Sequence, residues 1–278
     1  MHMHADGDKV RQYYAPFYGH HVADLALTLA ALRRRHDQVV FLAGDSSLDN
    51  KYWFNSWADA VNGYEEVLEP PAMKRDVCYW VNEEAARTHK SMGCLNTAVE
   101  ATSLNDRAFN RLLPQDEFIR DNIDVDDVLV VSVGGNDVAL APLLCTVLNL
   151  SMLVCCTPQV CLERCACAAP PNLGVDCGCL GCGLPGCLSG LAGWPPGFGY
   201  IVDLFKNRVE NYIRRLVAKK KPKRVLVCTI YYPEERASGG WADAALAALC
   251  YNVNPGKLQC ALRQIYRHAT SKIRIPGV

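Results

Sequence analysis

The sequence has no excess of charge of either sign, because 29 Lys and Arg residues balance 29 Asp and Glu residues. A nucleic-acid-binding domain carries a basic excess, so no nucleic-acid partner is expected. The first eight residues are polar and lack an apolar core segment, so no signal peptide is predicted and the protein is expected to be intracellular. The length of 278 residues, half of them apolar, suits one large domain.

Charge is also missing from one long internal run, Val138 to Leu162. A stretch of about 20 apolar residues is long enough to cross a bilayer. A proline and four polar residues interrupt this run, namely Pro142, Asn149, Ser151, Thr157 and Gln159. The composition therefore favours a buried helix or an apolar lid over a membrane span.

Apolar runs alternate with helical periodicities along the rest of the chain. Strands are expected at 38–43, 94–96, 127–133, 224–230 and 272–278, with a short extended piece at 76–80. Helices are expected at 20–35, 47–61, from Asn82 onward, 104–113, 201–217 and 258–268. This alternation predicts an α/β fold, a three-layer α/β/α sandwich around a mostly parallel sheet of about five strands.

The first strand runs directly into Gly44-Asp45-Ser46, and a helical pattern follows. A serine at such a strand end presents its hydroxyl beyond the sheet, in the positive field of the next helix. These are the requirements of a nucleophilic serine. The alternative is that Ser46 or Ser47 only caps the helix.

A second polar signature, Gly134-Gly135-Asn136-Asp137, ends the strand at 127–133. Ligands of parallel α/β sheets bind beyond the carboxyl ends of the strands. Because both signatures lie at such ends, we expect them to share one edge of the sheet.

These residues resemble the blocks of the SGNH hydrolases, also called the GDSL esterase and lipase family. The resemblance implies a five-stranded, flavodoxin-like sandwich, Ser46 as the nucleophile and Asn136 as a side-chain donor to the oxyanion. Gly44, Asp45, Gly134 and Asp137 support the site in this interpretation. The chemistry requires no cofactor.

The remaining blocks match the family less well. The oxyanion loop, usually N-x-G-x-x-G, here reads Asn96 to Ala101 with alanine at both glycine positions. The amide of Ala101 still offers an N–H, provided that the loop does not need a positive φ. The segment is otherwise a simple connection between a strand and a helix.

The family's general base, in a D-x-x-H arrangement, has no counterpart in the C-terminal third, so the base residues are unknown. His268 lies in an expected helix, and the earlier histidines are expected at surface or capping positions (His20, His21, His36 and His89). One interpretation is that the domain spans 1–278 and that its last strand and catalytic loop are cut off after 278. The other is that the protein never had the base.

Ten of the 15 cysteines fall between positions 145 and 187, within a Cys-, Gly- and Pro-rich stretch at about 140–200 that we interpret as a loop-like insertion. Structural zinc, disulfides, acylation at Cys155-Cys156 and free thiols all remain open. The candidate zinc ligands are Cys177, Cys179, Cys182 and Cys187. The insertion is also the expected contact site for a protein partner or a membrane surface.

The sequence thus favours an ester hydrolase that acts on an acyl ester, with a lipid as one possible substrate class. An acyltransferase with the same serine is equally compatible. The alternative function is a catalytically inactive SGNH-like structural or accessory subunit of a larger assembly, because fold alone does not fix function.

Overall fold

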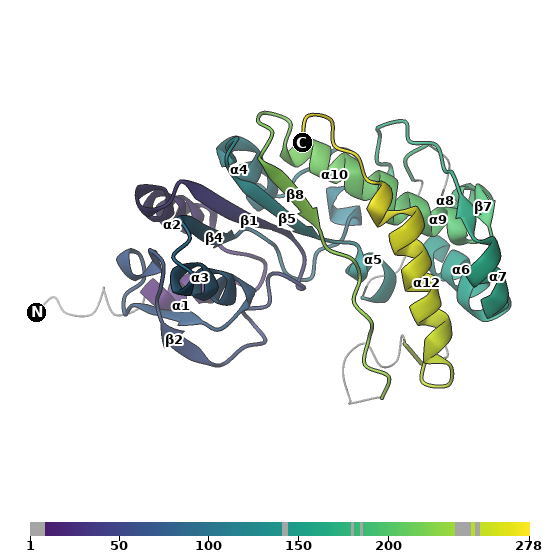
Figure 1. Ribbon diagram of the computed structural model, residues 1–278, viewed down its shortest axis with the longest axis horizontal. Helices are drawn as coiled ribbons and strands as arrows, with labels where there is room; N and C mark the ends of the chain where they lie inside the picture. The colour runs from purple at the N-terminus through teal and green to yellow at the C-terminus, as the bar shows by residue number, and fades with distance from the viewer. Residues whose placement is uncertain (1–8, 141–143, 179–180, 184–185, 237–245, 248–250) are drawn as a thin grey trace, which may run out of the picture.

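A computed structural model describes residues 9–140, 144–178, 181–183, 186–236, 246–247 and 251–278. Its central sheet contains four parallel strands in the order β4-β1-β5-β8 (Figure 1). The strands are β1 (Gln38–Gly44), β4 (Met92–Asn96), β5 (Val128–Ser132) and β8 (Arg224–Val227). The apolar, β-branched sequences of β1 and β5 are those of strands buried in a parallel sheet.

Helices cover both faces of this sheet. Side chains along a strand point alternately to the two faces, and all residues of β1 from Val39 to Gly44 are buried. The flanking helices include α2 (Val22–Arg35), α3 (Val77–Arg87) and α4 (Pro114–Asn122), which surround the sheet in Figure 1. The predicted α/β class and parallel sheet are therefore found, with four strands in the described part of the chain.

Short elements complete the N-terminal part. They are α1 (Lys9–Tyr14), the antiparallel pair β2 (Trp57–Asp59) and β3 (Ala72–Lys74), and the 3-10 turns η1 (Tyr64–Glu66) and η2 (Asn105–Arg107). Tyr13 and Tyr64 stack edge to face in the core beneath them, with ring centroids 6.3 Å apart.

The helix expected at 47–61 is absent, and this prediction was wrong. The Asp45 carboxylate accepts hydrogen bonds from the backbone N–H and the hydroxyl of Ser47, at 3.0 and 2.8 Å. Such a side-chain turn competes with helix initiation. The chain continues through turns and an exposed aromatic run at 52–54 into β2. Ser46 therefore has no helix N-terminus behind it and does not cap one.

Two further secondary-structure predictions were wrong. The extended piece expected at 76–80 belongs to α3, because the Asp76 carboxylate caps that helix by accepting the Tyr79 N–H at 2.8 Å. In place of a helix at 104–113, η2 and a loop occupy the segment. Pro114 begins α4 rather than ending a helix, as its missing N–H allows at a first helical position.

The strand expected at 272–278 is also absent. Residues Thr270–Lys272 form the 3-10 turn η6 at the end of α12 (Pro255–His268), and the rest is irregular. Consequently β8 is an edge strand in the described part of the chain. The expectation that the sequence stops in the middle of a strand is not met, because residues 273–278 form no strand.

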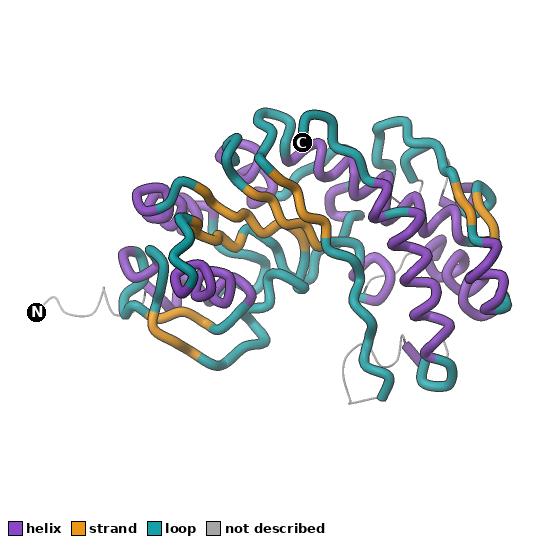
Figure 2. Tube along the Cα trace, in the orientation of Figure 1, coloured by secondary structure: helices purple, strands orange, loops and turns teal. Residues whose placement is uncertain are grey.

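A helical part lies beside the sheet (Figure 2). Its long helix consists of α9 (Phe198–Val202), the π-helical η5 (Asp203–Arg208) and α10 (Val209–Leu216), in place of the expected 201–217. The short α5 (Gly135–Ala139) follows β5.

The Cys-rich segment is more regular than expected. It forms α6 (Leu144–Ser151), η3 (Met152–Cys156), α7 (Gln159–Cys165), α8 (Gly186–Ser189) and the antiparallel pair β6 (Cys167–Ala168) and β7 (Gly193–Trp194). Among the described residues no single helix is long and apolar enough for a membrane span. One bent pair, Leu144–Cys156 with Gln159–Cys165 at 102°, passes by length and composition.

Candidate active site

Three loops meet at the carboxyl edge of the sheet: the first follows β1, the second follows β4 and the third follows β5. The Asp45 N–H donates to the Ser132 carbonyl at 3.1 Å, which joins the end of β1 to the end of β5. The Val99 N–H donates to the Gly44 carbonyl at 3.0 Å. The Asn136 amide donates to the Thr102 carbonyl at 2.9 Å. Each loop is therefore bonded to the other two, and the residues expected at the site lie on adjoining segments.

Ser46 lies in the turn after β1 and is partly exposed. Within the described residues, neither its hydroxyl nor its backbone N–H forms a hydrogen bond. The N–H of Ala101, on the second loop, is also unpaired in this part of the chain. Asn136 uses one of its two amide hydrogens on Thr102 and retains the other. Ser46 and Ala101 are both partly exposed, so their N–H groups are accessible as donors to a bound ligand.

The neighbouring Ser47 has a structural role that the sequence left open. Its hydroxyl lies 2.8 Å from Asp45 Oδ1 and 2.7 Å from the Ser132 hydroxyl. A hydroxyl has one hydrogen, so Ser47 donates to Asp45 while accepting from Ser132. Burial raises the pKa of Asp45, while the Ser47 N–H and hydroxyl oppose that rise. This network holds the turn that presents Ser46.

Ala101 adopts φ +57°, so the loop does take the left-handed conformation whose absence was the condition for the donor role of Ala101. Alanine pays a steric cost of about 1–2 kcal/mol there because of its Cβ. The neighbouring Thr102 fixes the loop from the other side, since its hydroxyl donates to the Val99 carbonyl at 2.7 Å. The loop thus keeps the backbone shape of a glycine-containing turn without the glycine.

Gly44 needs to be glycine. Its φ is +141°, and a Cβ would lie 1.7 Å from the Ser132 carbonyl oxygen. Gly134 has φ +102°, and a Cβ there would lie 2.8 Å from a ring carbon of Phe205. Both glycines therefore allow a close approach that brings the signature residues to the sheet edge.

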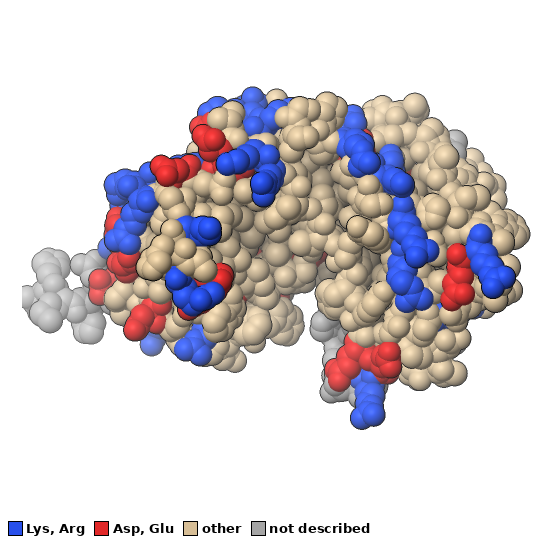
Figure 3. Space-filling view, in the orientation of Figure 1, with Lys and Arg blue, Asp and Glu red and all other residues tan. Residues whose placement is uncertain are grey.

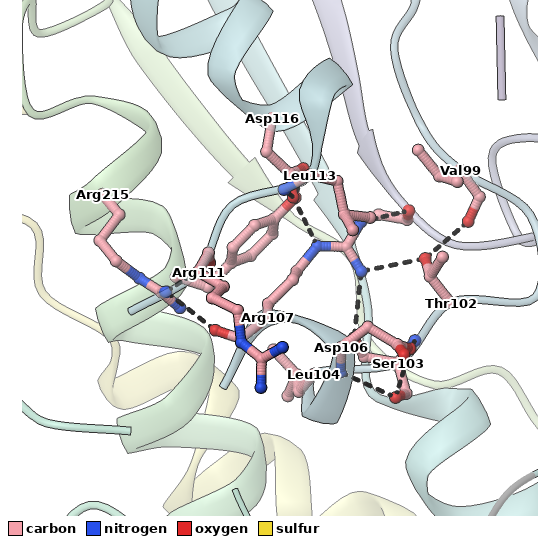
Figure 4. Close-up of polar contacts among 12 residues, drawn as sticks. Val99, Thr102, Ser103, Leu104, Asp106, Arg107, Arg111, Leu113, Asp116 and Arg215 are labelled. Atoms are coloured by element: carbon pink, nitrogen blue, oxygen red, sulfur yellow. Dashed lines mark hydrogen bonds and ion pairs between the residues drawn. The ribbon is translucent and has the colours of Figure 1, made fainter. Parts of the chain in front are cut away.

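Arg107 anchors the second loop and was not identified from the sequence (Figure 4). Its side chain is fully buried and its Nε donates to Asp116 at 2.9 Å. Its other nitrogens donate to the Thr102 hydroxyl at 2.9 Å and the Gly44 carbonyl at 3.1 Å. The Tyr212 ring lies 5.0 Å from its guanidinium carbon, and the Tyr212 hydroxyl donates to Asp116. One cation therefore connects β1, the second loop and α10.

Asp137 has a positioning role in the third loop. One carboxylate oxygen accepts the Leu104 N–H at 2.8 Å, and the other lies 3.9 Å from an Arg208 nitrogen. Burial raises the pKa of Asp137 to about 6, although the Arg208 guanidinium opposes the rise. Asp137 therefore links α5 to the second loop.

A buried charged cluster lies behind the second loop. The Lys51 ammonium donates to both oxygens of Asp49, at 2.6 and 2.8 Å, and both side chains are inaccessible to solvent. Asp49 also accepts the Glu100 N–H at 3.0 Å. The Glu100 carboxylate is 1% exposed, and neither oxygen has a hydrogen-bond partner. Burial, followed by the charge of Asp49, raises the pKa of Glu100 to about 7.

None of the five histidines in the described residues forms a hydrogen bond with Ser46. His20 contacts the Tyr13 carbonyl at 2.8 Å, and His36 contacts the Asn62 carbonyl at 3.1 Å. His268 packs against the Phe198 ring. His21 and His89 are exposed. The described part of the chain thus supplies no histidine base at Ser46.

The candidate zinc ligands are only partly described. Cys179 lies outside the described residues, and Cys187 lies in α8. Burial raises the pKa of the Cys182 thiol to about 12. No group of three potential ligands occurs among the described residues.

Every cysteine whose state is described is a free thiol, including the exposed Cys155 and Cys156. The loop around Cys177 is instead fixed by a buried ion pair, in which Arg208 Nε donates to Asp176 at 2.9 Å. No sequence pattern indicated this pair, because its members are 32 residues apart.

Comparisons with protein-family models, curated proteins and solved structures find no match for this chain.

Proposed function

We propose that this protein is an ester hydrolase of SGNH type in which Ser46 attacks an acyl carbonyl. The observation that carries the proposal is the unpaired state of the Ser46 hydroxyl and of the Ser46 and Ala101 N–H groups, on adjoining loops at one sheet edge. Preorganised donors of this kind stabilise the negative charge that develops on a carbonyl oxygen during acyl transfer.

Each residue has a defined part in this chemistry. Ser46 supplies the nucleophile, and its own N–H, the Ala101 N–H and the Asn136 amide receive the oxyanion. Arg107 and Ser47 position the loops from behind without touching the substrate. A serine hydroxyl is a weak nucleophile until a base accepts its proton, so the proposal needs a base from outside the described residues.

The surface beyond Asn136 suggests which class of substrate the site accepts. The helix α5 leads from Asn136 to the exposed Leu140, and α6 begins with Leu144, which is 75% exposed. Exposed apolar side chains of α6 continue this surface, including Val147 and Leu148. An acyl chain has the chemistry to cover such a surface, which supports an acyl-ester or lipid substrate.

The second candidate is a catalytically inactive SGNH-like subunit of a larger assembly. It is favoured by the lack of a histidine at Ser46 among the described residues. A site with donors but without a base gives only weak residual catalysis.

A fluorophosphonate probe and p-nitrophenyl butyrate hydrolysis separate the two candidates. The hydrolase predicts labelling of the wild-type protein, loss of labelling and activity in Ser46→Ala, and both retained in the control Ser56→Ala, an exposed serine before β2. Asn136→Ala should lower kcat by about 100- to 1,000-fold, as loss of one oxyanion donor does. A folded wild-type protein that neither labels nor hydrolyses the ester favours the inactive subunit, and full activity in Ser46→Ala overturns the catalytic assignment.

A further inference from the structure

The two edge strands of the central sheet, β4 and β8, differ in whether their outward-facing backbone groups are hydrogen-bonded. At β4, side chains bond the outward-facing backbone groups. The Asn82 amide accepts the Cys94 N–H at 2.8 Å and donates to the Cys94 carbonyl at 2.9 Å. The Asn62 amide donates to the Met92 carbonyl at 2.9 Å. This edge is therefore closed to any further strand.

At β8 the corresponding groups are open. Cys228 donates to the Val131 carbonyl, so backbone groups at even positions of β8 face β5, while those of Val225 and Val227 face outward. No described residue bonds to these outward groups, and no described strand pairs with this edge. The strand is also poorly covered, with Leu226 52% exposed. An open edge of this kind is a template for another extended chain.

Two adjoining hollows follow this edge. The first, of about 600 Å³, lies between Val225 and Val227 of the strand, Tyr266 of α12 and the C-terminal segment that follows this helix, from Thr270 to Val278. The second, of about 480 Å³, continues along Thr229–Tyr232 and shares Tyr266. The hollows offer apolar and aromatic walls beside an unpaired backbone edge, which is the arrangement used when a peptide adds a strand to a sheet.

The charged residues that line the two hollows are all basic. Their lining includes Arg263, Arg267 and Arg274 but no acidic residue. Figure 3 shows a row of basic side chains over α12 and the segment that follows it. Within the described residues neither the Arg267 nor the Arg274 guanidinium pairs with a carboxylate. The Arg274 guanidinium donates to the Ser271 and Ile273 carbonyls, and only its backbone N–H meets a carboxylate, that of Glu210, at 3.2 Å.

We propose that the open edge of β8 binds an extended acidic peptide segment of a partner protein. Backbone groups of the peptide pair with Val225 and Val227, alternate apolar side chains enter the hollows, and carboxylates meet the three arginines. A second copy of this chain fits less well. If two β8 strands paired antiparallel about a twofold axis perpendicular to the sheet, both α12 helices would lie on the same face. Their rows of arginines would then face each other and repel.

This proposal does not depend on Ser46 or on catalysis. Its test is fluorescence anisotropy with a fluorescein-labelled peptide, EVTVTVTEE, and its charge-reversed counterpart, KVTVTVTKK. The wild-type protein should bind the acidic peptide and not the basic one. The double variant Arg267→Glu/Arg274→Glu should weaken the acidic peptide by at least about 10-fold and strengthen the basic one, because each charge pair contributes several-fold. The control Arg87→Glu, an exposed arginine on α3, should change neither affinity.

The backbone pairing is tested separately. Val227→Pro removes an outward N–H while the bonds to β5 remain, a substitution that an edge strand tolerates. It should reduce acidic-peptide binding by at least about 10-fold. Hydrogen exchange of the wild-type protein should also show slower exchange at Val225 and Val227 when the peptide is added, a readout that does not depend on the proline variant folding.

Three outcomes would overturn the proposal. They are no binding of the acidic peptide, equal binding of both peptides, or binding without protection of these two amides. A dimer of the free protein in sedimentation velocity that Val227→Pro converts to a monomer would assign the edge to a second copy instead.

Discussion

The clearest stability prediction concerns the buried carboxylate of Glu100. Its pKa rises from 4.5 to about 7 in the folded protein, because burial and the charge of Asp49 disfavour the ionised form. A raised carboxyl pKa stabilises the fold fully below pH 4.5, and this contribution is lost as the pH rises through about 7. Ionisation at neutral pH therefore destabilises the native protein.

Glu100→Gln removes the ionisation and keeps the shape of the side chain. A difference of about 2.5 pH units corresponds to a ceiling of about 3 kcal/mol at about 1.36 kcal/mol per unit. The attraction of Lys51 and Lys74 is already contained in the pKa of about 7. The variant should therefore gain up to about 3 kcal/mol over the wild type, and this gain should develop as the pH rises from 4.5 to 8.

Urea unfolding of both proteins at a series of pH values measures this gain. The exposed Glu234→Gln serves as the control and should show no such trend. Only the pH-dependent part of the difference is diagnostic, since any packing cost of the amide is the same at every pH. A Glu100→Gln difference that stays constant from pH 4.5 to 8, or that favours the wild type more as the pH rises, would refute the reasoning.

Three further substitutions test the geometry of the sheet edge. Ala101→Gly should stabilise the protein by up to about 1 kcal/mol in thermal unfolding, because relief of the left-handed strain exceeds the added entropy of the unfolded chain; a loss of more than 1 kcal/mol would contradict that conformation. Arg107→Ala should cost about 3–5 kcal/mol in urea unfolding, because it leaves Asp116 buried without its cation; a neutral result would show that the pair is not needed. Gly44→Ala should prevent folding at 25 °C, as judged by circular dichroism, since its Cβ would overlap the Ser132 carbonyl; a native spectrum would refute the close approach.

Much of the sheet could be predicted from the sequence. Continuous apolar runs at β1, β5 and β8 leave few alternatives to strands, and the helices between them require parallel connections. The carboxyl ends of parallel strands share an edge, so the loops after β1 and β5 were expected together, and they are bonded there. The catalytic roles of Ser46 and Asn136 remain predictions.

The errors arose where side chains compete with the backbone. Apolar spacing after Ser47 favoured a helix, but the Asp45 carboxylate takes the Ser47 N–H and sets a turn instead. At 104–113 the Arg107 guanidinium holds the chain through Ser103 and Thr102. These bonds depend on groups that sequence spacing does not reveal, because Asp116, Gly44 and Tyr212 reach Arg107 only in the folded chain.

The sequence by itself determined the parallel α/β sheet and the polar signatures at its carboxyl edge, because hydrophobic periodicity and turn residues act locally. Only the tertiary structure decided that Ala101 takes a strained conformation, that Glu100 is buried without a partner and that β8 is open where β4 is closed. Each of these depends on which distant groups meet in space, since burial and hydrogen-bond satisfaction are properties of the packed chain.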